Sequence, residues 1–119
     1  MNSQELQLRL KQFAFRTVPL CESLPEKKIS RVVENQLLRS SFSAAANYRA
    51  ACKAQSSKAF TSKLSISFEE MDESLFWLEV ITELKLLGAN KIELITKEAD
   101  ELTRILASSR KTVQKKLLK

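Results

Sequence analysis

Residues 37–53 read LLRSSFSAAANYRAACK, and this stretch decides the fold. It holds no Gly and no Pro, so nothing within it interrupts a helix. Ser and Ala fill eight of its 17 positions, and Asn47 falls among them. Small side chains allow neighbouring helices to approach closely, because the distance between helix axes depends on the side chains at the contact. The stretch therefore predicts the centre of a helix around which other helices pack.

The rest of the chain continues this helical pattern. Only one Gly and two Pro occur in 119 residues, whereas β-hairpins need turn residues repeatedly. Apolar residues recur at spacings of three and four, which indicates amphipathic helices. The sequence predicts one all-α domain over residues 1–119, an antiparallel up-down-up-down four-helix bundle. The expected helices cover about 4–23, 26–54, 57–87 and 91–117.

Helix boundaries follow from a few residues. We expect Pro19 to kink the first helix near Phe15–Thr17 without ending it, because the apolar face continues in phase. Leu24-Pro25 should end that helix, and the second should begin at Pro25 or Glu26. Ser56 or Ser57 is the expected N-cap of the third helix. Gly88 is the expected C-terminal cap of that helix, and Asn90 the N-cap of the fourth.

Charge is unevenly distributed along the chain. Residues 1–65 hold 11 Lys/Arg and 4 Asp/Glu, residues 66–101 hold 3 and 10, and residues 102–119 hold 6 and none. Antiparallel packing should bring the end of the second helix and the end of the fourth together. That end would gather seven candidate contacts for nucleic acid: Arg49, Lys53, Lys58, Arg110, Lys111, Lys115 and Lys116. A phosphate-binding surface and a solvated end without a ligand both fit this pattern.

Polar residues near the expected seam have two interpretations. Inward Glu70 and Glu73 could bind two metal ions, but such sites also use His, and the chain has none. The structural interpretation pairs Arg39 with Glu70 or Glu73 as a buried ion pair, with Ser43 and Asn47 hydrogen-bonded nearby. We expect this second arrangement, a polar network that fixes the register of the bundle, and no metal or cofactor.

The aromatic and cysteine side chains give further expectations about function. Tyr48 and Trp77 could stack on bases, although packing in the core or at a subunit contact explains them as well. Cys21 and Cys52 lack metal-ligand spacing, and reduced thiols in the cytoplasm are expected. No signal peptide and no membrane span is predicted. The sequence offers no catalytic constellation, so we expect a protein that is not an enzyme.

Two segments carry a family resemblance: QLLRSSFSAAANYRAACKAQS, and FTSKLSISFEEMDESLFWLEVI after it. Together with ADELTRILASSRKT in the last helix, they resemble the four-helix-bundle proteins encoded in intervening sequences of bacterial 23S ribosomal RNA genes. Relatives of this family are the accessory variability determinant proteins of diversity-generating retroelements. Ala44, Ala45, Ala46 and Glu69 depart from the usual pattern. By matching positions, the residues that the family marks are Arg39, Ser43, Asn47, Tyr48, Glu70, Glu73 and Trp77.

The resemblance implies a ring-like homopentamer with a basic surface. The retroelement relatives bind a reverse transcriptase and nucleic acid. The leading hypothesis is therefore an oligomeric, non-enzymatic protein that binds RNA, DNA or a ribonucleoprotein. The alternative is a protein-protein adaptor, such as the reverse-transcriptase accessory subunit of a retroelement.

Overall fold

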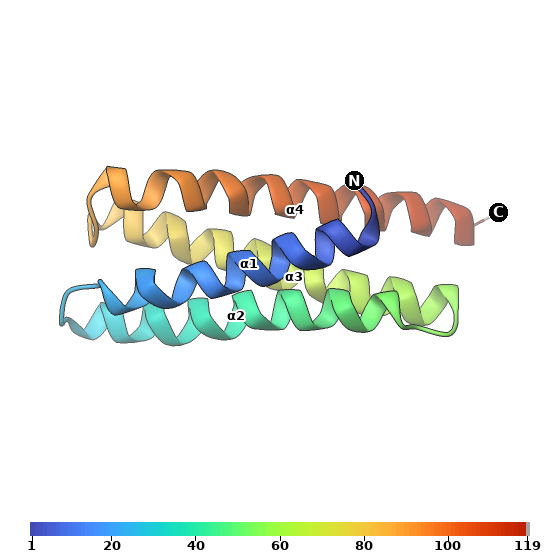
Figure 1. Cartoon of the computed structure of the whole chain (residues 1–119), viewed down its shortest axis with the longest axis horizontal. Helices are drawn as coiled ribbons and strands as arrows, with labels where there is room; N and C mark the ends of the chain where they lie inside the picture. Colours follow the sequence, from blue (N-terminus) through green and yellow to red (C-terminus); the bar gives the residue numbers. More distant parts are fainter. Residues whose placement is uncertain (119) are drawn as a thin grey trace.

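Four long helices account for nearly all of the computed structural model, which describes residues 1–118. They are α1 (Ser3–Glu22), α2 (Lys28–Cys52), α3 (Ser57–Glu83) and α4 (Ala89–Leu117). Consecutive helices run in opposite directions, and α1 crosses obliquely from beside α4 to beside α2 (Figure 1). The predicted all-α, up-down-up-down four-helix bundle is confirmed. No helix among the described residues is long and apolar enough to cross a membrane.

The core draws on all four helices and follows the predicted spacing of apolar residues. Leu10, Leu37, Leu78 and Leu102, one from each helix, are completely buried. The spacing of three and four along α2 places Ile29 and Asn47 on its inward face, and the structure differs at both positions. Asn47 is only half-buried and Ile29 is exposed, while Tyr48 is buried in the core. Helix α2 is rotated so that Tyr48 rather than Asn47 faces the core. This rotation avoids the energetic cost of burying the Asn47 side-chain amide.

Small residues form the seam between α2 and α3, as the quoted stretch predicted. Ser40, Ala44, Ser67 and Ser74 are completely buried there. The Ser40 and Ser74 hydroxyl oxygens lie 2.8 Å apart, and Ser67 Oγ donates to the Ala44 carbonyl oxygen at 2.7 Å. These bonds satisfy buried hydroxyls that would otherwise destabilise the core. The seam is therefore held by hydrogen bonds that only closely spaced helices can make.

The observed helix ends agree with the sequence-based predictions at some positions and differ from them at others. Ser56 is the N-cap of α3, and its side chain accepts from Ala59 N at 3.1 Å, as predicted. Helix α1 runs through Pro19, so one helix rather than two is confirmed, while the kink stays a prediction. The expected start at Pro25 or Glu26 is wrong. Helix α2 begins at Lys28, and Lys27, with an extended backbone at φ -139° and ψ 155°, is its N-cap.

The turn between α3 and α4 is the clearest correction. Gly88 does not cap α3; it precedes α4 with an ordinary negative φ and is the N-cap in place of Asn90. Helix α3 ends at Glu83, and Lys85 takes the left-handed conformation at φ 55°. Lys85 N donates to Thr82 O and Leu86 N to Ile81 O, at 3.1 and 3.0 Å. This is the Schellman pattern, and burial of Leu86 against the core fixes it without glycine.

Candidate functional site

Arg39 on α2 joins two carboxylates on α3. Its Nη1 donates to Glu70 at 2.6 Å and its Nη2 to Glu73, and Trp77 Nε1 donates to Glu73 at 3.2 Å. The hydrogen bonds that Arg39 donates, to Glu73 above all and then to Glu70, raise the pKa of its guanidinium. The expected pairing is present, but the expected burial is wrong, since the Arg39 side chain is 48% exposed. The cluster bridges two helices at the surface rather than inside the core.

Ser43 and Asn47 do not join this cluster. Asn47 Nδ2 donates to the carbonyl and the hydroxyl of Ser43, at 2.9 and 3.1 Å, one turn away on the same helix. The expected network therefore splits into an interhelical ion cluster and a local bond within α2. The sequence spacing predicts Asn47 near the two carboxylates, but the rotation of α2 directs its side chain toward Ser43 instead.

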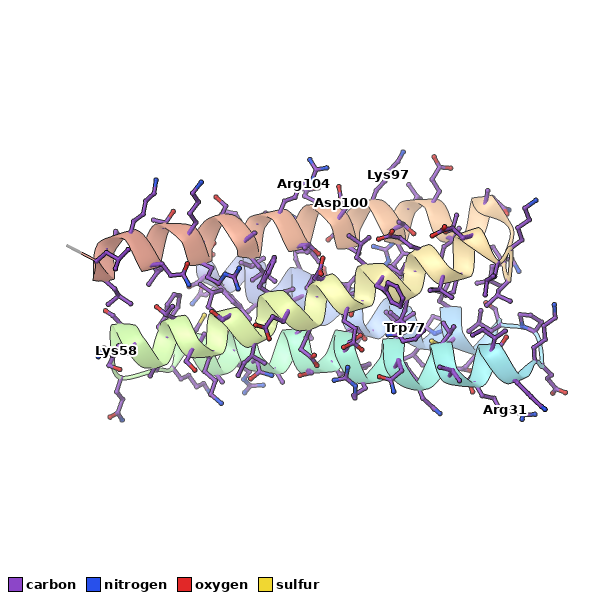
Figure 2. All side chains as sticks on the ribbon, turned by 180° about the vertical axis from the view of Figure 1, so that it is seen from behind. Arg31, Lys58, Trp77, Lys97, Asp100 and Arg104 are labelled. Carbon is purple, nitrogen blue, oxygen red and sulfur yellow. The ribbon has the colours of Figure 1, made fainter. Side chains whose placement is uncertain are left out.

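Basic side chains gather at one end of the bundle, as the charge distribution predicted. Figure 1 shows the α2–α3 turn and the end of α4 at the same end, and Figure 2 places Lys58 there and Arg31 at the opposite end. We call this the basic end, defined by Arg49, Lys53, Lys58, Arg110, Lys111, Lys115 and Lys116. All of them are exposed except Arg110, which is half-buried with its guanidinium 4.3 Å from the Phe68 ring centre.

The basic end carries little compensating negative charge. Residues 35–68 and 102–119 contain no Asp or Glu. None of the seven cations forms an ion pair within residues 1–118, where the paired cations are Arg9, Arg39, Lys97 and Arg104. Unpaired cations at one end of an elongated molecule create a field that attracts phosphates.

The aromatic residues that sequence reasoning singled out are not the accessible ones. Tyr48 is buried and Trp77 half-buried, so neither presents an open ring face to a base. The exposed aromatic residues include Phe15 and Phe42, whose ring centres lie 6.0 Å apart across the α1–α2 surface. Together with Leu8 they line a groove between these helices. The sequence carries one signal of this groove, a second stripe at spacings of three and four along the first helix. The stripe consists of Leu8, Lys11, Phe15 and Val18.

No group of three or more His, Cys, Asp or Glu side chains that could hold a metal ion occurs in the described part of the chain. Cys21 is buried, and burial above all, with Glu34 and Glu22 contributing, raises its pKa to about 12. Its thiol is thus a core group held in the neutral form.

The fold and the site define a small four-helix-bundle protein with one strongly basic end. The chain belongs to the 23S rRNA-intervening sequence protein family, whose model matches residues 4–108. Its structure is also similar to a solved protein of unknown function from the S23 ribosomal protein family of Bacteroides thetaiotaomicron. That similarity has a TM-score of 0.83 at 32% identity and covers 93% of this chain and 99% of the other. No curated protein matches the chain.

Proposed function

We propose that this chain is a non-enzymatic, oligomeric protein of the cytoplasm that binds RNA or a ribonucleoprotein through its basic end. The observation that carries the proposal is the set of uncompensated cations, drawn from two segments that contain no acidic residue. The family's link to 23S ribosomal RNA genes and the ribosomal-protein family of the solved relative support RNA as the partner.

The geometry suits phosphates better than bases. The cations come from the C-terminal parts of α2 and α4, from the C-cap of α2 and from the first turn of α3, and Tyr48, which adjoins Arg49 in the sequence, is buried. Lys and Arg that contact phosphates release counterions, so affinity falls steeply with salt. We therefore expect binding that follows the shape of a structured RNA rather than its sequence.

Fluorescence anisotropy with a labelled, structured ribosomal RNA fragment tests the proposal across a series of salt concentrations. The test variant carries Lys111→Glu, Lys115→Glu and Lys116→Glu. The matched control carries three reversals at the opposite end: Lys27→Glu, Lys28→Glu and Arg31→Glu. Losing three phosphate contacts should lower the slope of log affinity against log salt by roughly three, while the control keeps the slope of the unmodified protein.

Two results would count against RNA binding at this end. One is an affinity that does not change with salt, and the other is an equal loss of affinity in both variants. A protein that binds no RNA but co-purifies with a reverse transcriptase would favour the adaptor alternative instead.

A further inference from the structure

A pocket opens at the basic end, between the start of α3 and the end of α4. Figure 2 shows these two helices apart at this end, where Lys58 is labelled. The pocket has a volume of about 560 Å³, within the range of roughly 300–1,000 Å³ that is usual for small-molecule pockets. Its lining comes from the α2–α3 turn and from both helices: Ala54, Gln55, Ser56, Ser57, Phe60, Val113, Lys116 and Leu117. We call it the end pocket.

Part of the end pocket is apolar. Phe60 and Val113 are half-buried, and Leu117 is 43% exposed. Val113 and Leu117 are four residues apart, so both lie on the same face of α4. An aromatic ring and two aliphatic side chains that line one pocket offer a flat nucleobase the contacts that stacking requires.

The rest of the lining carries hydrogen-bonding groups. Gln55 is exposed, and its side-chain amide offers both a donor and an acceptor. Ser56 Oγ accepts from Ala59 N at 3.1 Å, which leaves its own hydroxyl hydrogen available to donate. Ser57 adds a second, exposed hydroxyl. These groups suit the polar edge of an unpaired base, which carries donors and acceptors that pairing would otherwise occupy.

The charge around the end pocket is positive only. Lys116 lines it, and Lys58 and Lys115 each adjoin a lining residue in the sequence. None of these three cations forms an ion pair in the part of the chain that the structure describes. Residues 35–68 and 102–119, which supply the whole lining, contain no Asp or Glu. Because phosphates flank every base in RNA, this charge favours a nucleotide over the apolar side chain of a protein partner.

We propose that the end pocket takes one unpaired base of a structured RNA, from a nucleotide that bulges out of a helix. The base lies against Phe60 and Leu117, and its flanking phosphates contact Lys58 and Lys116. The inference rests on the proposed function and names the feature of the RNA that is recognised. A bulge is a feature of RNA shape, and a base of any identity can stack. A fully paired helix offers no such base, because its bases stay stacked inside the duplex.

Three RNA hairpins test the pocket by fluorescence anisotropy at one salt concentration. The first carries a single bulged adenosine, the second has an abasic nucleotide at the same bulge, and the third is fully paired. The abasic hairpin is the matched control, because it keeps the bulged backbone and its phosphates but lacks the base. We expect the adenosine bulge to bind roughly tenfold more tightly than the other two, since one stacked base typically changes affinity by roughly 5- to 100-fold.

Two variants connect this preference with the pocket. Phe60→Leu removes the aromatic ring but keeps an apolar side chain, and Leu117→Ala shortens a side chain near the end of α4. Each should lower the preference for the adenosine bulge to below about threefold, with an unchanged melting temperature confirming that the variant is folded. The control is Leu84→Ala at the opposite end of the bundle, where Leu84 is 55% exposed. It should keep the preference of the unmodified chain.

Separate results would overturn the pocket and the proposed function. Equal, salt-dependent affinity for the adenosine and abasic bulges would overturn the pocket and leave RNA binding at the basic end in place. A preference that survives in both Phe60→Leu and Leu117→Ala would also overturn the pocket alone. If those variants instead lose the capture of a protein partner, the pocket belongs to that protein. No affinity for any of the three hairpins at low salt would refute the proposed function, and the pocket with it.

Discussion

Replacing Ala44 with Leu should separate α2 from α3 and destabilise the bundle strongly. Ala44 is completely buried, and its carbonyl oxygen accepts the Ser67 hydroxyl at 2.7 Å. A larger side chain at such a site costs about 1–3 kcal/mol by overpacking. Moving the helices apart also weakens that bond and the 2.8 Å contact between the Ser40 and Ser74 hydroxyls, each worth about 0.5–1.5 kcal/mol.

Together these costs come to about 2–6 kcal/mol of unfolding free energy, which at roughly 4 °C per kcal/mol corresponds to a melting temperature lowered by roughly 8–24 °C. Chemical denaturation followed by circular dichroism measures the change. The matched control is Ala59→Leu, at an exposed position of α3, which should stay within about 0.5 kcal/mol of the unmodified protein. If Ala44→Leu and Ala59→Leu have equal effects, the seam is not closely packed and the reasoning fails.

Three further predictions concern single residues. Lys85→Gly should raise the unfolding free energy by about 0.5–1 kcal/mol, because glycine adopts the left-handed conformation at φ 55° without strain; a melting temperature that falls would refute this. Arg39→Ala should cost only about 1 kcal/mol in thermal unfolding, with a smaller loss in high salt, because its ion pairs to Glu70 and Glu73 are partly exposed; a loss of several kcal/mol would indicate a buried cluster. In a Cys52→Ser background, Cys21 should resist a thiol reagent at pH 8 in the folded protein and react once the protein is unfolded, because burial raises the pKa of its thiol to about 12. Rapid labelling of the native protein would contradict this burial.

The same raised pKa has a consequence for stability at high pH. The neutral thiol of Cys21 is favoured in the folded state, so its contribution is fully present below the ordinary thiol pKa of 9.0. As pH rises from there toward about 12, the unfolded chain loses this proton first, and the contribution is lost.

The helical pattern predicted the fold, because the fold depends on a spacing of apolar residues that recurs along the whole chain. Leu10, Leu37, Leu78 and Leu102 all belong to stripes with spacings of three and four, and all are buried. The small residues around Ala44 likewise predicted a close helix contact, because few other structures require so many of them in succession.

Other features depend on tertiary contacts that no local pattern encodes. Lys85 adopts the conformation expected of Gly88, because burial of Leu86 decides where the chain turns. The direction of Asn47 depends on the rotation of α2, which Tyr48 sets by entering the core. The Phe15–Phe42 pair joins residues that are distant in sequence, so only the packing of α1 against α2 reveals the groove.

The central claim is that the uncompensated cations of the basic end bind RNA. Cross-linking from Gln55→Cys tests it most directly, because Gln55 is exposed in the α2–α3 turn at the basic end. The background carries Cys52→Ser, and a photoreactive group attached to the new thiol is irradiated in the presence of a structured ribosomal RNA fragment. Glu26→Cys, exposed at the opposite end of the bundle, is the matched control. The account predicts cross-links to RNA from position 55 and few from position 26, whereas equal cross-linking from both positions would contradict it.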